Sequence, residues 1–171
     1  MRAKRSRPAL MFLGMENSGK TSVLNGLMGL SSSHVSPTIG YEQKVVKIGK
    51  KTKAKVLDFG GKPEVRKIWR EFYHLADGIV FFVDGTDAKK FEEVELLLME
   101  VARDTKQLPV MVLITHQDIA GCYSSEMIVE ELRLHRNLVG RKWGVHACST
   151  AFKFGFLEAM KSMKHMILDK K

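Results

Sequence analysis

Gly-Met-Glu-Asn-Ser-Gly-Lys-Thr, residues 14–21, follows directly on the apolar run Pro8–Leu13. The letters fit G-x-x-x-x-G-K-[ST], and a buried strand leading into a glycine-rich turn and a helix start is the context that this phosphate-binding loop needs. The N–H groups of the turn and of the helix N-terminus would face phosphate oxygens. Lys20 can reach the β- and γ-phosphates, and Thr21 can place its hydroxyl on Mg²⁺. The candidate phosphate-binding residues are Gly14, Glu16, Asn17, Ser18, Gly19, Lys20, Thr21 and Ser22.

Composition indicates one globular domain. The chain has 171 residues, of which 44% are hydrophobic and 27% charged, enough to bury a core. We expect a single domain over residues 1–171 with a short basic segment at 1–7. No signal-peptide pattern and no long apolar span is present. The only cysteines are Cys122 and Cys148, which suits a reducing, cytoplasmic environment.

The formal net charge of +9 raises the question of an acidic partner. Basic residues cluster at 2–7, 44–55 and 161–171, without a nucleic-acid-binding motif or interleaved aromatic residues. A solvated basic surface is the simplest interpretation. An acidic membrane or an acidic protein comes next, and nucleic acid is the least favoured partner.

Periodicity predicts an α/β fold. Short apolar runs suited to buried parallel strands occur at Ala9–Leu13, Ile79–Val83 and Pro109–Ile114. Helical spacing predicts helices at Lys20–Leu30, Ala88–Arg103, Ser125–Leu138 (after Ser124 as N-cap) and Phe154–Leu168. Glu42–Ile48 and Lys53–Phe59 are predicted to form a hairpin. The result is a mixed sheet of about six strands, with one antiparallel strand at its edge and helices on both faces.

Four further segments narrow the chemistry. Thr38, before the hairpin, can bring its hydroxyl to Mg²⁺ and its backbone to the γ-phosphate. Asp58 ends the second hairpin strand and can hold Mg²⁺, while Gly60 and Gly61 allow a backbone N–H to approach the γ-phosphate. Asp118, in Thr115-His116-Gln117-Asp118, can accept from guanine N1–H and the 2-amino group. Backbone amides near Ser149 and Thr150 could meet guanine O6.

With these segments together, the chain resembles a small GTPase of the Arf/Arf-like family, which has the P-loop NTPase small G-domain fold. The marks are the phosphate loop, Pro37-Thr38-Ile39-Gly40, and Asp58-Phe59-Gly60-Gly61 followed by Ile68-Trp69-Arg70-Glu71-Phe72-Tyr73. The resemblance implies a monomeric switch that binds GTP or GDP with Mg²⁺ and recruits effectors in the GTP state, in membrane or vesicle trafficking. The positions that match the family's effector surface are Tyr41, Leu57 and Phe72, with Leu57 in place of a usual tryptophan.

Lys62 is the first departure from the family, which usually has glutamine after the two glycines. That glutamine orients the attacking water, whereas a protonated lysine has three donors and no acceptor. Lys62 could pair with a γ-phosphate oxygen or point to solvent. In either case we expect slow hydrolysis, with Lys62 and Gly61 as the candidate catalytic positions.

The guanine motif is the second departure. The family has Asn-Lys-x-Asp where this chain has Thr115, His116 and Asp118. Asp118, the main discriminator, is kept, but Thr115 lacks the paired donor and acceptor of an amide, and His116 lacks the long aliphatic stem of lysine. An imidazole can still stack on a base. We expect guanine preference to persist with reduced affinity.

The third departure concerns membranes. The family's usual anchor is a myristoylated glycine at position 2, and here that position is Arg2. The last residues, Asp169-Lys170-Lys171, hold no cysteine for prenylation. We expect a cytoplasmic protein whose membrane contact, if any, is peripheral and depends on basic attraction or on a partner.

Two other functions stay open. The residues Lys62, Thr115 and His116 are also compatible with a pseudo-GTPase, that is, a binding scaffold with little or no nucleotide turnover. A small P-loop kinase would need an acceptor site and an arginine-rich lid, whereas this chain uses that length for the hairpin and for Asp58-Phe59-Gly60-Gly61.

Overall fold

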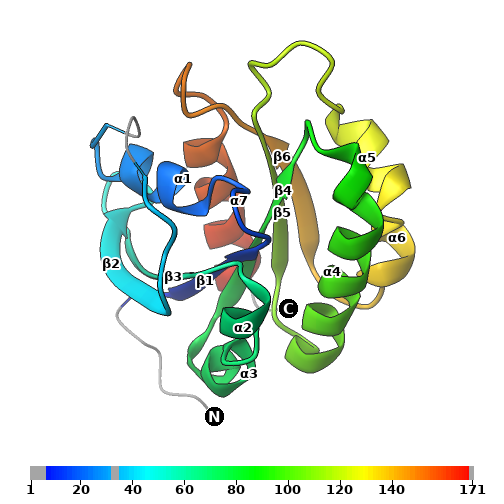
Figure 1. Ribbon diagram of the computed structural model, residues 1–171. Coiled ribbons are helices and arrows are strands. Elements are labelled where there is room, and N and C mark those ends of the chain that lie inside the picture. Colours follow the sequence, from blue (N-terminus) through cyan, green and yellow to red (C-terminus); the bar gives the residue numbers. More distant parts are fainter. Residues whose placement is uncertain (1–6, 32–34, 170–171) are drawn as a thin grey trace.

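A computed structural model describes residues 7–31 and 35–169, so the basic segment expected at 1–7 lies outside the described residues except for Arg7. Its centre is a six-stranded sheet in the order β2-β3-β1-β4-β5-β6 (Figure 1). The strands are β1 (Ala9–Gly14), β2 (Tyr41–Lys47), β3 (Lys53–Phe59), β4 (Gly78–Asp84), β5 (Val110–Thr115) and β6 (Trp143–Ala147). Neighbours are parallel except β2 and β3, which form the antiparallel hairpin at one edge. The predicted mixed sheet is confirmed.

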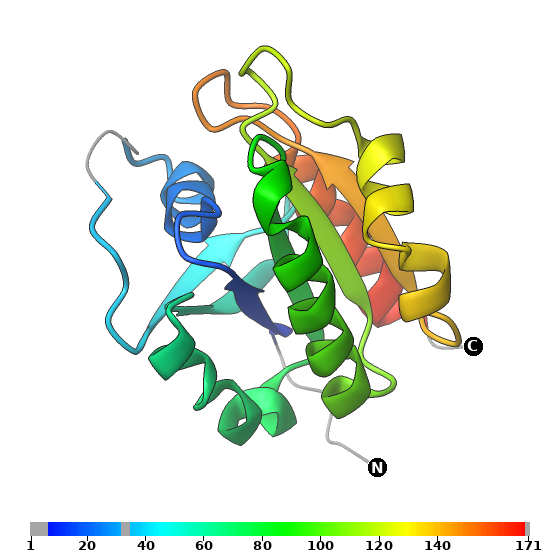
Figure 2. The same cartoon turned by 45° about the vertical axis from the view of Figure 1, so that its right-hand side comes forward.

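Helices cover both faces of the sheet, as predicted (Figures 1 and 2). On one face lie α1 (Lys20–Leu27) and α7 (Phe156–Leu168). On the other lie α2 (Pro63–Arg66), α3 (Trp69–Phe72), α4 (Phe91–Thr105), α5 (Ser125–Glu131) and α6 (Leu134–Asn137). Short 3₁₀ turns, η1 (Tyr73–Leu75) and η2 (Ala88–Lys90), precede β4 and α4.

Alternation along the central strands builds two cores. Met11 and Leu13 of β1 belong to the core beneath α4, while Leu10 and Phe12 belong to the core beneath α1 and α7. Successive side chains of a strand point to opposite faces. Strands covered on both faces therefore need continuous apolar runs, and the sequence of β1 supplies one.

The predicted helix Ser125–Leu138 is two helices, α5 and α6, which is a correction. Arg133 between them has a left-handed backbone with φ of 47°. Leu132 and Leu134 are both fully buried, yet residues two apart in one helix point about 200° away from each other. The break lets both leucines face the core. Ser124 caps α5 as expected, since its Oγ accepts from the Met127 N–H at 3.3 Å.

The parallel strands bring their carboxyl ends to one edge of the sheet, where ligands bind in open α/β folds. Gly14, Asp58, Asp84 and Thr115 stand at the ends of β1, β3, β4 and β5 at this edge. No helix within the described residues is long and apolar enough to span a bilayer.

Candidate functional site

The loop between β1 and α1 wraps around the ammonium group of Lys20. Lys20 Nζ donates to the carbonyl oxygens of Met15 at 2.6 Å and Gly14 at 3.3 Å, and to Ser18 Oγ at 3.2 Å. The residue is only 6% exposed, and burial lowers its pKa to about 8. The predicted phosphate loop therefore holds a largely desolvated cation at its centre, where a phosphate would interact with it strongly.

Three oxygen-bearing side chains from separate segments meet beside this loop. Thr21 Oγ1 donates to Asp58 Oδ2 at 2.6 Å and lies 3.1 Å from Thr38 Oγ1. Asp58 is fully buried and its Oδ1 has no hydrogen-bond partner among the described residues. Burial raises the pKa of Asp58 to about 6, against the opposing effects of the Thr21 hydrogen bond and Lys20.

This donor set fits Mg²⁺. The ion prefers oxygen ligands and is usually held by one or two carboxylates together with waters and substrate phosphates. The unpaired Oδ1 of Asp58 is a buried acceptor that a cation, directly or through water, would satisfy. The described residues contain no cluster of three or more His, Cys, Asp or Glu side chains suited to a metal.

Gly60 and Gly61 pack tightly against two different segments of the site, Gly60 against Thr38 and Gly61 against the phosphate loop. A Cβ on Gly60 would lie 2.4 Å from the Thr38 carbonyl oxygen, and one on Gly61 would lie 2.3 Å from the Glu16 backbone nitrogen. Trp69 Nε1 donates to the Gly60 carbonyl at 3.3 Å. Because a trans peptide points its C=O and N–H in opposite directions, the Gly61 N–H is turned away from Trp69. Only glycine allows this close approach of backbones.

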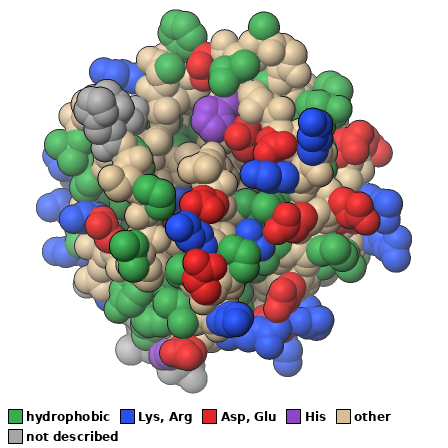
Figure 3. Space-filling view, viewed as in Figure 1, with side chains coloured by type: hydrophobic (Ala, Val, Ile, Leu, Met, Phe, Trp, Pro, Cys, Tyr) green, Lys and Arg blue, Asp and Glu red, His purple; other side chains and the backbone are tan. Residues whose placement is uncertain are grey.

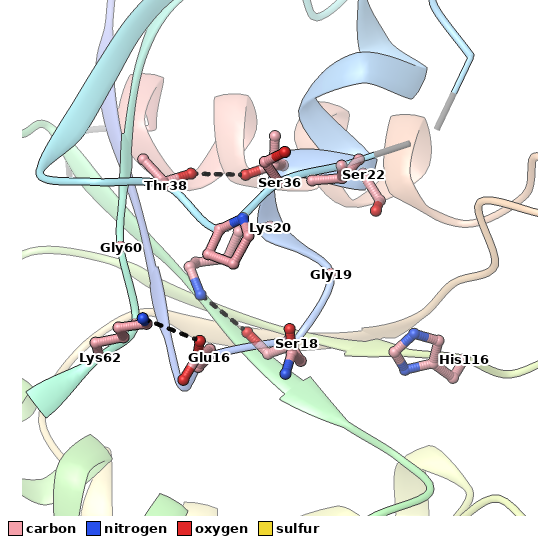
Figure 4. A pocket seen from close by; sticks show the side chains of 15 residues that line it. Glu16, Ser18, Gly19, Lys20, Ser22, Ser36, Thr38, Gly60, Lys62 and His116 are labelled. Atoms are coloured by element: carbon pink, nitrogen blue, oxygen red, sulfur yellow. Dashed lines mark hydrogen bonds and ion pairs between the residues drawn. The ribbon is translucent and has the colours of Figure 1, made fainter. Parts of the chain in front are cut away.

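Lys62 is exposed, but its ammonium group has a partner in the phosphate loop. Its Nζ lies 3.9 Å from Glu16 Oε1, an ion pair that joins the segment after β3 to the phosphate loop. Figure 4 shows the two side chains turned toward each other at one side of the pocket, with His116 at the opposite side. Both side chains are partly exposed, so Lys62 can exchange this partner for another anion at small cost.

These residues line one cavity of about 190 Å³. Its walls are Glu16, Asn17, Ser18, Gly19, Lys20, Thr21, Ser22, Val35, Ser36, Pro37, Thr38, Gly60, Gly61, Lys62 and His116. Most of the predicted phosphate and Mg²⁺ positions are thus brought together. Six predicted positions of the nucleotide site are not part of this lining: Gly14, Asp58, Thr115, Asp118, Ser149 and Thr150.

Thr115 anchors the next segment to the phosphate loop. It is 3% exposed, and its Oγ1 lies 2.9 Å from the Ser18 carbonyl oxygen and 3.3 Å from that of Val83. A single hydroxyl hydrogen serves these acceptors, whereas the family's asparagine amide carries two donors. Thr115 therefore ties the two loops together with fewer hydrogen bonds.

His116 forms a pair that the sequence did not predict. Its Nδ1 lies 3.0 Å from Asp84 Oδ1. That hydrogen bond raises the pKa of His116 above its ordinary value. Burial alone would raise the pKa of Asp84, but hydrogen bonds from His116 and Thr86 outweigh it and lower the pKa to about 2. The sequence held a signal for this pair: Asp84 comes directly after the predicted strand Ile79–Val83, and Thr115 directly after the predicted strand Pro109–Ile114. The carboxyl ends of parallel strands meet at one edge of a sheet.

Asp118 is held in place by the last loop. Ser149 Oγ donates to Asp118 Oδ1 at 2.6 Å, which lowers the pKa of this exposed carboxyl. The Ser149 N–H already donates to the Phe154 carbonyl oxygen at 3.1 Å. Ser149 therefore acts on Asp118 through its hydroxyl, and the Thr150 amide is the remaining candidate for guanine O6.

The three positions that match an effector surface separate in the structure. Tyr41 is 43% exposed and its ring packs on Phe72 with centroids 4.7 Å apart. Leu57 is 1% exposed, so its expected surface role is wrong. Its side of β3 faces the core that includes Trp69, which removes Leu57 from any partner's reach.

Comparison with known proteins agrees with this geometry. A model of the ADP-ribosylation factor (Arf) family matches residues 1–167. The chain belongs to the Arf family. Members are small GTPases that act as GTP-binding switches, so the resemblance drawn from the sequence motifs is confirmed. This Arf-family chain is similar to ADP-ribosylation factor-like protein 3 of Caenorhabditis elegans, with 34% identity over 142 residues, covering 82% of this chain and 77% of that protein.

Further relatives cover more of the chain. ADP-ribosylation factor-like protein 3 of Chlamydomonas reinhardtii is 27% identical over 169 residues, covering 98% of this chain and 94% of that protein. Among solved structures, the Arl6 BBS3 small GTPase from Trypanosoma brucei with bound nucleotide analogue GppNp superposes with a TM-score of 0.87. It is 21% identical and covers 96% of this chain and 99% of that chain. At this identity the likeness shows the fold alone.

Proposed function

We propose that this Arf-family chain binds GTP or GDP with Mg²⁺ and recruits effector proteins when GTP is bound. One observation carries the proposal: Lys20, Thr21 and Asp58 converge beside one cavity, with a buried Asp58 oxygen that has no partner among the described residues. The family's GTPase character supports guanine as the base. A T. brucei structural neighbour holds a nucleotide analogue, which is consistent with the same ligand class here.

Each part of the cavity has a separate task in this proposal. Lys20 and the loop amides bind the phosphates, and Thr21, Thr38 and Asp58 would hold Mg²⁺, which neutralises charge on the β- and γ-phosphate oxygens when bound. The Gly61 N–H would donate to a γ-phosphate oxygen. Asp118, fixed by Ser149, would read the guanine edge.

Hydrolysis is proposed to be slow. Lys62 offers donors but no acceptor, so it cannot orient a water as glutamine does. Its ion pair with Glu16 brings its ammonium group to the phosphate loop, and a γ-phosphate oxygen could replace that carboxylate. Such a contact would favour the GTP state over turnover.

A single-turnover assay tests this proposal. Purified protein is loaded with GTP and Mg²⁺, and phosphate release is followed for wild type, Lys62→Ala and Lys62→Gln. We expect wild type to cleave at a rate of about 10⁻⁴ s⁻¹ or slower, with Lys62→Gln faster. Wild-type cleavage well above that rate, unchanged in Lys62→Ala, would contradict the assignment. The nucleotide that copurifies is identified in parallel.

A second candidate is a pseudo-GTPase that serves as a binding scaffold. Lys62, Thr115 and His116 favour it, because they replace the water-positioning and base-contacting residues of the family. A purified protein that carries no nucleotide and shows no measurable GTP binding would select this candidate.

We also propose a role in membrane or vesicle trafficking with a peripheral contact to acidic membranes. The basic clusters of the sequence support this contact. Tyr41 and Phe72, which share an aromatic cluster with Phe59, are the proposed effector-contacting residues. We propose that the chain acts as a monomer.

A further inference from the structure

The free end of the β2–β3 hairpin carries positive charge that the nucleotide site does not use. Five residues line a hollow of about 300 Å³ together with Gly49 and Thr52. We call these five the hairpin basic surface: Arg7, Lys47, Lys50, Lys51 and Lys53. All five are exposed. Lys164 of α7 extends toward Gly49 from the neighbouring helix and adds to the same field.

The fold leaves this charge unneutralised. Within the described ranges, none of the five side chains lies within 4.0 Å of an acidic group, and the ion pairs occur elsewhere. Lys47 is directly opposite Lys53 in the β2–β3 register. Like charges facing each other across strands destabilise a sheet. The hairpin therefore tolerates a repulsion that its own folding does not require.

Protection of the sheet edge explains only part of this cluster. Lysines on an edge strand prevent another sheet from pairing with it, and β2 is such a strand. That reason covers Lys47. It extends to Lys53, which lies outside the β1–β3 register that begins at Lys55. It does not cover Lys50 and Lys51 in the turn, nor Arg7 before β1.

The composition of the surface distinguishes among anionic partners. Protein interfaces are depleted in lysine and have an apolar or aromatic centre, which this hollow lacks. Single-stranded nucleic acid is held by aromatic side chains that stack on bases, and no aromatic residue lines the hollow. A membrane with acidic lipids needs only clustered cations on flexible apolar stems.

We propose that the hairpin basic surface is the face on which this chain docks onto an anionic membrane. The inference rests on the proposed peripheral membrane contact and names the surface that makes it. Figure 3 shows Lys and Arg side chains along the side of the molecule where Figure 1 places β2. Lys53 and Asp58 are five residues apart on one strand, about 17 Å at 3.3 Å per residue, so docking leaves the nucleotide cavity open.

The test is co-sedimentation of the full chain with vesicles of phosphatidylcholine containing about 30% phosphatidylserine, at about 0.15 M salt. The variant Lys50→Gln/Lys51→Gln removes two charges at the turn. The matched control, Lys89→Gln/Lys90→Gln, removes two adjacent exposed lysines before α4. We expect the partition coefficient to fall about 25-fold in the hairpin variant, because each cation near an acidic surface contributes about a factor of five, and much less in the control.

The outcomes separate the two proposals. Absence of wild-type binding, or equal binding to pure phosphatidylcholine vesicles, overturns the anionic membrane contact and this surface together. Wild-type binding that both double variants reduce equally overturns the surface alone. Tighter binding to a single-stranded RNA of about 20 nucleotides than to acidic vesicles overturns the membrane in favour of nucleic acid. GTP-analogue binding, measured on the same samples, reports separately on the nucleotide site.

The variant Lys53→Thr tests whether Lys53 serves membrane docking or the stability of the hairpin. Threonine suits a strand, and the substitution removes the repulsion with Lys47. We expect an equal or higher thermal midpoint together with weaker vesicle binding. A lowered midpoint with unchanged vesicle binding would show that Lys53 serves the fold, and would overturn its place in the docking surface.

Discussion

At the phosphate end of the candidate site, Lys20 and Asp58 are buried, and Thr21 of α1 is joined to Asp58 of β3 by a 2.6 Å hydrogen bond. At the base end, Asp118 is exposed and His116 is half-buried. At the phosphate end, Lys20, Thr21, Thr38 and Asp58 match the family's pattern and Lys62 departs from it, whereas the base end keeps only Asp118. The comparison teaches that Lys20 and Asp58 lie in a more desolvated setting than Asp118 and His116.

The physical reason lies in desolvation. Interactions of a charge strengthen as water is removed from around it, so a substitution of Lys20 or Asp58 leaves an unpaired buried group. Around the exposed Asp118 and the half-buried His116, water can replace a lost partner. Thr115 is the exception at the base end, because it is buried and depends on the Ser18 carbonyl oxygen. The following predictions test this contrast, beginning with the largest effect.

Lys20→Ala should weaken GTP binding about 100- to 1000-fold, because truncating one partner of a desolvated charge contact costs about 2–5 kcal/mol. Fluorescent-nucleotide titration measures the change. Lys89→Ala, which removes an exposed lysine, is the matched control and should leave binding unchanged. Retention of near wild-type affinity in a folded Lys20→Ala protein would break the contrast.

Asp118→Asn should lower GTP affinity about 10- to 100-fold, since a hydrogen bond to a charged group contributes about 1.5–3 kcal/mol. The amide offers a donor where the carboxylate accepted, so affinity for a xanthine nucleotide should rise. Competition titrations with GTP, ATP and xanthosine triphosphate measure both effects. Equal affinity of the wild type for ATP and GTP would show that the base end no longer selects guanine.

Thr115→Val should lower the free energy of unfolding by about 1 kcal/mol, because the Ser18 and Val83 carbonyl oxygens lose the hydroxyl that reaches them. Thr115→Ser keeps the hydroxyl and is the control. Urea unfolding of both variants gives the comparison. If valine and serine destabilise equally, the hydroxyl is not what joins the base end to the phosphate loop.

The smallest effect is a pH dependence from His116. Asp84 raises the folded-state pKa of His116 above its unfolded value, so the contribution to stability is complete below about pH 6.5 and is lost as pH rises through the folded-state pKa. The pair is partly exposed, which limits the effect to about 0.5 kcal/mol, or about 1–2 °C. His116→Asn tolerates the left-handed backbone at this position, where φ is 60°, and should flatten this dependence above about pH 6.5. If the stability of the wild type and of His116→Asn declines equally as pH rises, the pH dependence comes from another group.

Much of the fold follows from local patterns. Runs such as Ile79–Val83 predicted buried strands because a strand covered on both faces must be apolar throughout. The Gly49–Thr52 turn between alternating segments predicted the hairpin that is observed. The break at Arg133 was not predictable from spacing alone, because it depends on where Leu132 and Leu134 meet the core.

For the candidate site too, one part follows from the sequence alone and another part only from the tertiary structure. By itself the sequence determined the phosphate loop, since Gly14–Thr21 is contiguous and its chemistry depends on local backbone geometry. Only the tertiary structure decided that Lys62 pairs with Glu16, that His116 pairs with Asp84, and that Leu57 is buried. Each of those outcomes depends on residues brought together from separate strands and loops. A side chain's own neighbours in sequence do not specify which distant group or core it will meet.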